Sequence, residues 1–568
     1  MSHSRRWRLQ PQSPELCSRI AAELSIHPLV AQVLVNRGIS SGDLARSFLK
    51  PDLDQLHDPF LLPGMDKAVQ RLRLACRNSE KVLVYGDYDV DGVTSTAVVW
   101  RYLRSIGLEA FRYIPHRMEE GYGLNSESVS VIRDQGVSLV ITVDCGVTSR
   151  EQIQALRDQG IDTIVIDHHE PEEGAFPQAA VAVIDPKCEG STYPFRDLAG
   201  VGLAAKFVHA ASGKFPLHDL DLITLGTIAD VVPLRGENRI IVQAGLGSIY
   251  RTTKPGLRAL IRLARIEGKP VTTYTVGFTL GPRLNAAGRM GTAKTSLDLL
   301  LCEDDAASDG LAELLEEHNR ERQKIQNSVF EQAAAMVEDD PSFREQKVLV
   351  VHGDNWHRGV LGIAASKLTD RYARPSVVIS FSDGLGTGSA RSIEGFHLNE
   401  AFAACASALE SFGGHSRAAG LKVRRDKVSD LRALINVFAG KNLAADMLPV
   451  IDVDAQLPLA QVSMELLGQL AALEPYGEAN PAPFFATRHL RLKTSVQVMG
   501  KETVKFWVTD GRVACQAVGF GMAKVCSDLK IGQPVDIVYN LAVDDWNKVA
   551  QPQLTLKDIR PGKSGQKQ

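Results

Sequence analysis

A short apolar run at residues 82–85 is followed by three carboxylates spaced two apart, Asp87, Asp89 and Asp91, and then by an amphipathic run at 95–106. This succession is typical of a strand that leads into a helix in a parallel α/β sheet. Ligands gather at the carboxyl ends of the strands of such sheets. Carboxylates placed there repel one another, and a bound cation removes that cost. The alternative is a loop of solvated aspartates that caps the following helix.

Further apolar runs carry the same kinds of residue. One ends at Asp144, and the next ends at Asp167, which His168 and His169 follow directly. A fourth apolar segment contains a lone carboxylate, Asp230. An isolated buried carboxylate is costly, whereas several aspartates and two imidazoles at strand ends can share a metal ion. Such a set suits Mn²⁺, Mg²⁺ or Zn²⁺, and its excess of carboxylates favours Mg²⁺ and Mn²⁺.

The composition indicates a soluble globular protein. Its 568 residues suggest three or four domains, with 44% apolar and 23% charged residues. We expect neither a membrane span nor a signal peptide, because no apolar run is long enough and the N-terminus lacks an apolar core. Eight scattered cysteines without a Cys-x-x-Cys pair favour a reducing cytoplasm over structural zinc. The net charge of −3 argues weakly against nucleic-acid binding, although bound metal and local arginines can form a positive groove.

The apolar periodicity divides the chain into five segments. They are a helical lead-in at 1–50, an α/β domain with a parallel sheet at 51–310, a connecting helix at 311–340, a second α/β domain at 345–445, and an all-β barrel of the OB type at 450–562. The strands of the first sheet are expected near 82–85, 110–114, 139–143, 162–166 and 181–184. The long helix could connect two domains over roughly 40 Å, or could be a surface helix of the first domain.

Three glycine-rich stretches could contact phosphate. The segment 200–205, GVGLAA, resembles a dinucleotide-binding fingerprint, but it follows no clear strand and no acidic partner lies at the right distance. The segments 384–392 and 412–420 combine glycine with Ser, Arg and His, so their backbone amides could face a phosphate. They could equally be simple turns. No P-loop motif occurs, which argues against ATP hydrolysis of that kind.

Aromatic residues of the barrel segment allow two interpretations. Phe506, Trp507, Phe520 and Trp546 could stack on the bases of a single strand, or they could belong to the core. The proline-containing segment 474–483 is expected to form a rigid connection into the barrel.

Seven short motifs, in matching order, resemble those of the DHH phosphoesterases. Four of them are GDYDVDG at 86–92, DCG at 144–146, DHH at 167–169 and GTIAD at 226–230. The other three resemble later motifs of the RecJ branch: RLNAAGR at 283–289, GSARS at 388–392 and GGH at 413–415. The resemblance runs from about residue 50 to the end of the barrel. It implies a DHH domain, a DHH-associated domain and an OB-fold, and the activity of a single-strand-specific 5′ exonuclease.

The resemblance also implies a two-metal site for Mn²⁺ or Mg²⁺. Asp89 and Asp144 would hold one ion, while Asp91, Asp144, His168 and Asp230 would hold the other, with Asp144 as the bridge. His169 would contact the scissile phosphate, and Asp167 would orient a histidine. Many members have a histidine at the position of Tyr85, so the first ion would be held more weakly here, or by Asp87. Two ions imply in-line hydrolysis of a phosphodiester without a covalent intermediate.

Substrate contacts are implied as well. The resemblance places a pocket for the 5′ phosphate between the two α/β domains, with Arg117, Ser389 and Arg391 in it. A terminal phosphate carries more charge than an internal diester, so arginine and hydroxyl donors can recognise it. The alternative is that Arg117 pairs with Glu119 or Glu120, and that Ser389 and Arg391 only shape a turn. Further substrate-binding candidates from the motifs are Arg283, Asn285, Arg289 and His415.

The expected function is therefore 5′→3′ hydrolysis of single-stranded DNA to 5′-mononucleotides, in DNA repair and recombination. Two alternatives are a DHH enzyme for pyrophosphate or very short oligonucleotides, and a non-catalytic replication scaffold. The barrel argues against the first alternative, and the complete set of candidate metal ligands argues against the second. The resemblance implies a cytoplasmic monomer that works with a helicase and a single-strand-binding protein.

Overall fold

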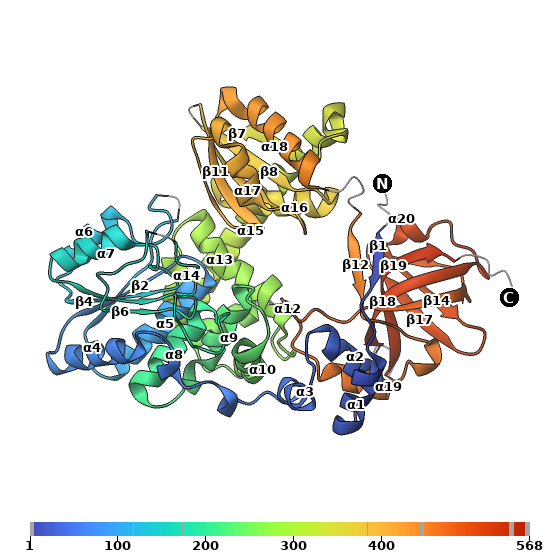
Figure 1. Ribbon diagram of the computed structural model, residues 1–568, viewed down its shortest axis with the longest axis horizontal. Coiled ribbons are helices and arrows are strands. Elements are labelled where there is room, and N and C mark those ends of the chain that lie inside the picture. Colours follow the sequence, from blue (N-terminus) through green and yellow to red (C-terminus); the bar gives the residue numbers. More distant parts are fainter. Residues whose placement is uncertain are drawn as a thin grey trace. The chain divides into compact units, whose positions relative to one another are not determined.

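The computed structural model describes residues 5–117, 119–172, 174–382, 384–443, 448–544 and 550–562. They form two compact units (Figure 1). The larger unit comprises His57–Val232 and Gly245–Met447. The barrel unit comprises Met1–Leu56, Pro233–Ala244 and Leu448–Gln568. No helix of the described residues is long and apolar enough to cross a membrane.

The larger unit begins with a five-stranded parallel sheet in the order β3-β2-β4-β5-β6. The strands are β2 (Val82–Gly86), β3 (Ala110–Tyr113), β4 (Leu139–Val143), β5 (Asp162–Ile166) and β6 (Ala182–Ile184). Figure 1 shows α6 (Ser126–Asp134) and α7 (Arg150–Asp158) on one face, with α5 (Val90–Ser105) and α8 (Gly200–Ser212) on the other. The predicted parallel sheet is confirmed. Its strands therefore all end at one edge, where the predicted aspartates lie.

Helices continue the larger unit. They are α9 (Leu220–Ala229), α11 (Pro255–Leu263), α12 (Thr273–Thr275), a π-helical segment (Val276–Leu280), α13 (Gly281–Met290), α14 (Lys294–Leu301) and α15 (Asp305–Asp339), while α4 (Met65–Arg77) precedes β2. The predicted long helix is confirmed as α15, which packs against α11 and α13 and then against α16 (Leu361–Tyr372). It begins before residue 311 because Asp304 caps it by accepting the amide of Ala307.

The second α/β sheet has the order β10-β11-β9-β8-β7. Its strands are β7 (Leu349–Asp354), β8 (Ser376–Ser382), β9 (Leu385–Arg391), β10 (Ser411–Gly414) and β11 (Ala418–Arg424), flanked by α16, α17 (Leu398–Ala404) and α18 (Val428–Asn442). The alternative that the glycine-rich segments are simple turns is wrong, since most of their residues lie in β9, β10 and β11. Gly386 packs so closely that a Cβ there would lie 2.6 Å from the ring of Phe381, so this strand requires glycine.

The barrel unit contains a seven-stranded sheet in which an additional β14–β16 pairing closes the barrel. Its strands are β13 (Ala455–Gln456), β14 (Phe485–Leu492), β15 (Gln497–Met499), β16 (Thr503–Thr509), β17 (Ala514–Gly519), β18 (Pro534–Asp544) and β19 (Gln551–Pro561), with α19 (Met464–Ala471) and α20 (Ala523–Cys526). The predicted all-β barrel is confirmed.

The N-terminal lead-in belongs to the barrel unit. Strand β1 (Arg6–Leu9) pairs in parallel with β12 (Val450–Val453). The three lead-in helices are α1 (Pro14–Leu24), α2 (Pro28–Asn36) and α3 (Gly42–Leu49). Buried residues of α1 and α2, such as Ile20 and Val30, share one apolar core with Phe485 and Tyr539 of the barrel. The lead-in is therefore part of the folded barrel unit.

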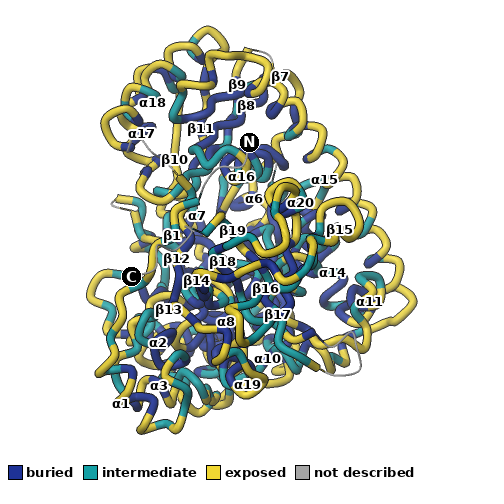
Figure 2. Tube along the Cα trace, turned by 90° about the vertical axis from the view of Figure 1, so that its right-hand side faces the viewer, coloured by how far each residue is buried: buried dark blue, intermediate teal, exposed yellow. Residues whose placement is uncertain are grey.

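The barrel aromatics have different environments, and Figure 2 shows the burial along the chain. Phe506 is 1% exposed and belongs to the core, so the core interpretation holds for this residue and stacking on bases is excluded. Trp507 is half-buried, while Phe520 is 68% exposed. Trp546 lies outside the described residues.

A buried arginine supports the connection into the barrel. Arg239, in the first half of α10 (Gly236–Tyr250), donates to the carbonyls of Phe48, Ala472, Leu473, Glu474 and Pro475. Its guanidinium also lies 3.8 Å from the ring centre of Phe48. Burial lowers the pKa of Arg239 to about 10.

Candidate metal centre

The first group of carboxylates lies where β2 turns into α5. Asp87 is buried, and Asp89 is the N-cap of α5, where its Oδ1 accepts the amides of Asp91 at 2.9 Å and Gly92 at 3.2 Å. Only glycine fits at Gly92, because a Cβ there would lie 2.4 Å from the carbonyl oxygen of Asp87. Capping therefore accounts for one oxygen of Asp89, but not for the buried carboxylates on either side of it.

Asp91 is held by a second helix. Its Oδ2 accepts the amide of Gly200 at 2.6 Å and its Oδ1 accepts the amide of Val201 at 2.8 Å, both at the start of α8. The amides of a helix N-terminus favour an anion. The fingerprint-like segment at 200–205 thus binds a carboxylate of the protein itself. This use of its amides argues against a dinucleotide site.

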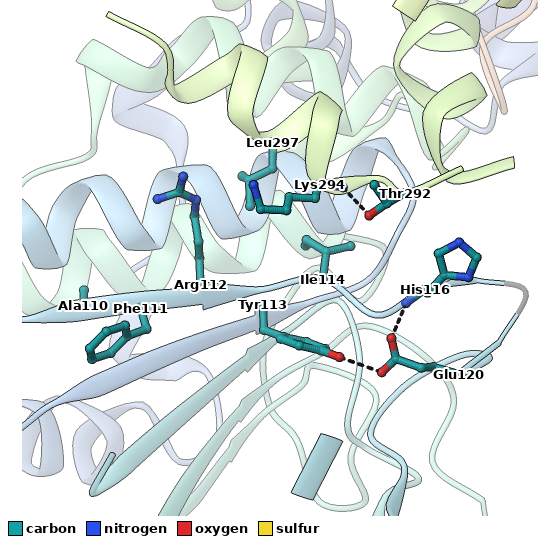
Figure 3. Close-up of a pocket in the computed structure, with 10 residues that line it drawn as sticks. All are labelled: Ala110, Phe111, Arg112, Tyr113, Ile114, His116, Glu120, Thr292, Lys294 and Leu297. Carbon is teal, nitrogen blue, oxygen red and sulfur yellow. Dashed lines mark hydrogen bonds between the residues drawn. The ribbon is translucent and has the colours of Figure 1, made fainter. Parts of the chain in front are cut away.

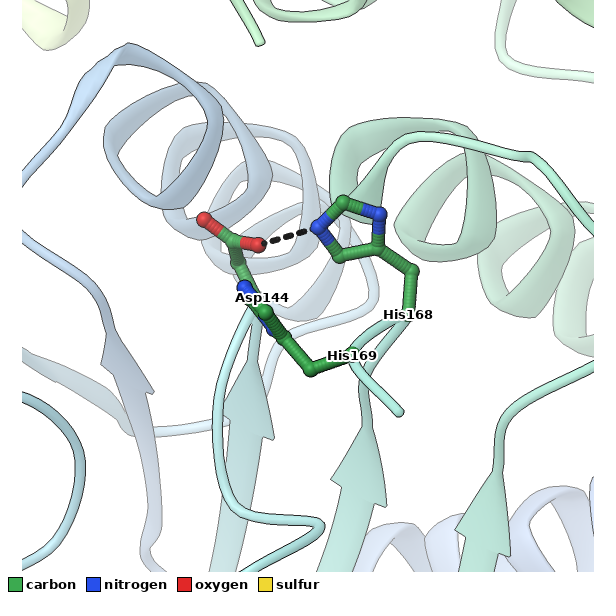
Figure 4. Close-up of side chains that lie close together, drawn as sticks. All are labelled: Asp144, His168 and His169. Atoms are coloured by element: carbon green, nitrogen blue, oxygen red, sulfur yellow. Dashed lines mark ion pairs between the residues drawn. The ribbon is translucent and has the colours of Figure 1, made fainter. Parts of the chain in front are cut away.

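Asp144 and His168 lie at the centre of the cluster, as Figure 4 shows. Asp144 directly follows β4 with a φ of 60°, and its Oδ1 lies 3.1 Å from Nε2 of His168. The same nitrogen lies 3.6 Å from Oδ2 of Asp230 and 4.0 Å from Oδ2 of Asp91. Asp230 follows the last residue of helix α9, so the expectation of a strand end there was wrong. Its side chain nevertheless reaches the cluster.

Asp167 orients His169. Its Oδ1 lies 2.7 Å from Nδ1 of His169 and accepts the amides of His168 and His169, while its Oδ2 accepts the amide of Val147. Burial alone would lower the pKa of His169, but the hydrogen bond and the charge of Asp167 outweigh burial and raise it. Burial would raise the pKa of Asp167, and the contact with His169 lowers it instead. His169 therefore has a fixed ring and favours the cationic form.

Two further side chains of this region were not predicted. The hydroxyl of Tyr122 lies 3.0 Å from Nδ1 of His169 and donates to the carbonyl of Asp144 at 3.3 Å. Asp185 directly follows β6 and is buried, and burial raises its pKa to about 7. The pattern of an apolar run followed by aspartate would have identified Asp185. No such pattern identifies Tyr122, which lies between β3 and α6.

The donor set fits divalent cations. Oδ1 of Asp87, Oδ1 of Asp144 and Nε2 of His168 are buried without a hydrogen-bond partner among the described residues. Three groups of ligand atoms lie within 4.8 Å of one another: Asp87, Asp89 and Asp144; Asp91, His168 and Asp230; and Asp144, His168 and His169. Neighbouring ligands of an octahedral ion with bonds of about 2.1 Å lie about 3 Å apart, as do Asp144 and His168.

The electrostatics favour the same interpretation. Burial and then the neighbouring aspartates raise the pKa values of Asp87, Asp144 and Asp230 well above the usual range, and that of Asp91 to about 7. Burial and then His169 lower the pKa of His168 to about 3, which leaves the neutral imidazole that metals bind. The metal-free cluster would therefore hold protons, which a divalent cation would displace.

A group of three arginines, Arg117, Arg289 and Arg391, lies near the cluster, where the charge of Arg117 acts on Asp87 and that of Asp89 acts on Arg289. The guanidinium of Arg117 lies 4.6 Å from the ring centre of Tyr88, Arg289 donates to the carbonyl of Gly359 at 3.0 Å, and Arg391 donates to Oγ of Ser389 at 3.3 Å. Burial and then Arg117 lower the pKa of Arg289 to about 9, and both lower that of Arg391. The structure thus brings these three arginines together with Ser389.

The structure does not support the alternative roles of Arg117, Ser389 and Arg391, namely a surface ion pair and a turn. Glu120 accepts from the hydroxyl of Tyr113 and the amide of His116, while Glu119 lies 3.8 Å from Nδ1 of His116. Neither glutamate pairs with Arg117 in these contacts. Ser389 and Arg391 lie in strand β9, so the alternative that they only shape a turn is wrong.

The remaining predicted substrate contacts lie apart from these groups. Arg283 pairs with Glu316 at 2.8 Å. Asn285 is half-buried in α13, and His415 is exposed directly after β10. A separate cavity of about 510 Å³ lies between β3 and α14, lined by Arg112, Tyr113, His116, Glu120, Thr292 and Lys294 among others (Figure 3). Asp298 pairs with both Arg112 and Lys294, so these two cations are already compensated.

Comparisons with known proteins match this arrangement. Family models match at 81–227 (DHH family, N-terminal domain), 345–441 (DHHA1 domain) and 453–558 (RecJ OB domain). The single-stranded-DNA-specific exonuclease RecJ of Dickeya dadantii is 33% identical, over 94% of this chain and 96% of that protein. The chain belongs to the RecJ family. The Bacillus subtilis RecJ is 38% identical, over 97% of this chain and 70% of that protein.

Solved structures of the family share the fold. The crystal structure of Thermus thermophilus RecJ in complex with Mn²⁺ aligns with a TM-score of 0.83 and 28% identity, covering 98% of this chain and 80% of that one. The Mg²⁺ complex of the same protein aligns with a TM-score of 0.78. The predicted fold, with two α/β domains and an OB-type barrel, is therefore confirmed.

Proposed function

We propose that this chain hydrolyses phosphodiester bonds of single-stranded DNA as a metal-dependent 5′→3′ exonuclease that releases 5′-mononucleotides. The observation that carries the proposal is the cluster of buried carboxylates around His168 with its unpartnered ligand atoms. Membership of the RecJ family supports single-stranded DNA as the substrate. Mn²⁺ and Mg²⁺ are the proposed ions, because the donors are mainly carboxylates and the Thermus relative was crystallised with each metal.

We propose two sets of ligand atoms that share Asp144. We assign Asp87, Asp89 and Asp144 to one ion, and Asp91, Asp144, His168 and Asp230 to the other. Tyr85 does not contribute, because it is buried and its hydroxyl donates to the carbonyl of Gly123 at 2.9 Å. When bound, two such ions supply a nucleophilic hydroxide and neutralise the charge that develops on the phosphate and the leaving oxygen.

His169 has a separate role. Its raised pKa favours a ring that can donate a proton in a hydrogen bond to the scissile phosphate. Asp167 and Tyr122 both contact Nδ1, so they would position the ring, and Nε2 would be the atom that faces the substrate. His169 would thereby stabilise charge without itself binding a metal.

The group of arginines would account for the direction of hydrolysis. Arg117, Arg391 and Ser389 would bind the terminal 5′ phosphate, and Arg289 would bind the next phosphates near the cluster. Burial and then the charge of Arg117 lower the pKa values of Arg289 and Arg391, so a bound phosphate would relieve the repulsion between these cations. A strand held by its 5′ end would present one phosphodiester bond at a time. Asn285 and His415 remain proposed substrate contacts from the motif match.

The cellular setting is proposed from the family. The enzyme would be a cytoplasmic monomer that acts in DNA repair and recombination. A helicase and a single-strand-binding protein would supply its single strands, since the enzyme itself would not open a duplex. The eight cysteines are all free, which is consistent with a reducing compartment.

Labelled oligonucleotides test the function. With Mn²⁺, a long single strand labelled at its 5′ end should release labelled mononucleotide at once, whereas a 3′ label should first appear in shortened strands. A duplex of the same sequence should resist. Hydrolysis of pyrophosphate alone would favour the small-substrate alternative, and inactivity towards both substrates with every metal would favour the scaffold alternative.

A further inference from the structure

One lysine lies beside the metal cluster without belonging to it. Strands β5 and β6 are neighbours in the first sheet, and His168 closely follows β5 while Lys187 closely follows β6. Nζ of Lys187 lies 3.4 Å from Oε1 of Glu170, the residue directly after His169. Because adjacent strands are only about 5 Å apart, we place the ammonium group about 10 Å from the nearest proposed metal ligands.

The backbone of Lys187 is held in place on both sides. Its amide donates to Oδ1 of Asp185 at 2.8 Å, and its carbonyl accepts from the guanidinium of Arg196 at 3.1 Å. The loop that contains these residues connects β6 to α8 and leads into Gly200, whose amide holds Asp91. Lys187 therefore belongs to a loop that also fixes a proposed metal ligand, so the fold sets its distance from the cluster.

The charge of Lys187 acts on two of the proposed ligands. Burial and then the charge of His169 lower the pKa of His168, and the charge of Lys187 lowers it further. Burial and then the neighbouring aspartates raise the pKa of Asp230, and the charge of Lys187 opposes that rise. A positive charge that acts on both ligands must also repel a divalent cation bound between them.

Glu170 compensates this charge only in part. Its side chain is 62% exposed, whereas the side chain of Lys187 is 20% exposed. Water and salt screen an exposed carboxylate more effectively than a mostly buried ammonium group. The two side chains together therefore leave a net positive potential at the cluster.

We propose that Lys187 sets the metal affinity of the cluster by repelling the ion that His168 and Asp230 would bind. This inference rests on the proposed function, because it concerns an ion of the same site. Lys187 would contact neither the ion nor the substrate. Its charge would determine the concentration of Mn²⁺ or Mg²⁺ at which the cluster fills, and Glu170 would moderate that effect.

Isothermal titration calorimetry of the metal-free protein with Mn²⁺ tests the proposal. A single and a double positive charge about 10 Å apart repel each other enough to weaken binding about 4-fold in a water-like dielectric, and about 17-fold at half that dielectric constant. Lys187→Gln should therefore bind Mn²⁺ about 4- to 17-fold more tightly than wild type. Lys187→Arg keeps the charge and should bind Mn²⁺ like wild type.

Three controls separate the charge of Lys187 from other effects. Lys269→Gln makes the same change in net charge at an exposed lysine between α11 and α12, and should leave the affinity unchanged. Glu170→Gln removes the opposite charge and should weaken Mn²⁺ binding, by a smaller factor than Lys187→Gln strengthens it. The gain in Lys187→Gln should shrink when NaCl rises from about 0.05 M to about 0.5 M, because salt screens the repulsion.

Several outcomes would overturn the proposal. Equal Mn²⁺ affinity of wild type and Lys187→Gln would do so, as would an equal gain in Lys269→Gln or in Lys187→Arg. Weaker Mn²⁺ binding by Lys187→Gln would show that the lysine supports the loop instead of opposing the ions. Because calorimetry requires no hydrolysis, a wild type that binds Mn²⁺ but releases no mononucleotide would contradict the proposed function and not the role of Lys187.

Discussion

Replacing Gly200 with alanine should weaken metal binding without unfolding the protein. A Cβ at Gly200 would lie 2.8 Å from Oδ1 and 2.9 Å from Cβ of Asp144, distances that force one side to move. The amide of Gly200 also holds Asp91, so any shift of α8 moves a second candidate ligand. Both carboxylates would leave the positions that the proposed ions require.

The expected magnitude follows from overpacking. Inserting a methyl group into a packed site costs about 1–3 kcal/mol, which here would oppose the geometry of the metal-bound state. Because about 1.4 kcal/mol corresponds to a factor of ten, Gly200→Ala should weaken Mn²⁺ binding about 5- to 150-fold. Isothermal titration calorimetry measures this affinity directly, and single-strand cleavage should then require correspondingly more Mn²⁺.

Gly202→Ala is the matched control on the same helix. Its Cβ would meet Cδ2 of Leu198 at 3.0 Å, a flexible apolar side chain outside the cluster. This variant should bind Mn²⁺ as wild type does. If Gly200→Ala also binds Mn²⁺ like wild type, or if both variants lose affinity equally, the close approach of α8 to Asp144 does not shape the site.

Three further predictions follow from the described contacts. Arg391→Ala should lose a charge-assisted contact worth about 1.5–3 kcal/mol and reduce the preference for 5′-phosphate over 5′-hydroxyl strands roughly ten- to a hundredfold, and an unchanged ratio would exclude Arg391 from end recognition. The pKa of Asp91 rises from 3.8 to about 7 in the metal-free fold, so the stability that its protonation provides is lost as pH rises through 7. Mn²⁺ should therefore raise the melting temperature more at pH 8 than at pH 6. An equal rise at both pH values would contradict this prediction. Arg239→Met leaves the carbonyls of Phe48, Ala472 and Glu474 without their hydrogen-bond donor. Urea unfolding should show that the free energy of unfolding of the barrel unit falls by about 3–5 kcal/mol. A loss below about 1 kcal/mol would mean that water replaces the guanidinium.

The sequence predicted the parallel sheet and most of the acidic cluster because both depend on local patterns. Apolar runs of strand length end in Asp87, Asp144 and Asp167, and parallel strands must bring those ends to one edge. His168 directly follows one of these strand ends, and Asp230 was identified as a lone carboxylate in an apolar segment, although that segment is a helix instead of a strand.

Contacts between distant segments could not be predicted in this way. Asp91 depends on amides that lie 109 and 110 residues away, where the glycines suggested a nucleotide site. Strand β9 requires glycine because Phe381 packs against it, whereas composition alone left a turn and a phosphate contact as equal alternatives. The lead-in helices complete a core whose other half lies more than 400 residues later, as the contact of His27 with Gln469 illustrates. None of these pairs leaves a pattern along the chain.

The most direct test of the central claim compares wild type with Asp144→Ala in the Mn²⁺-dependent release of mononucleotides from a long single strand. Asp144 is the one carboxylate assigned to both ions, and it is 2% exposed. Its removal also relieves repulsion among neighbouring aspartates, so the metal-free variant should melt no lower than metal-free wild type. We expect release by wild type with Mn²⁺, and no detectable release by the folded variant at any Mn²⁺ concentration. Release by folded Asp144→Ala at the wild-type rate would contradict the two-ion site described here.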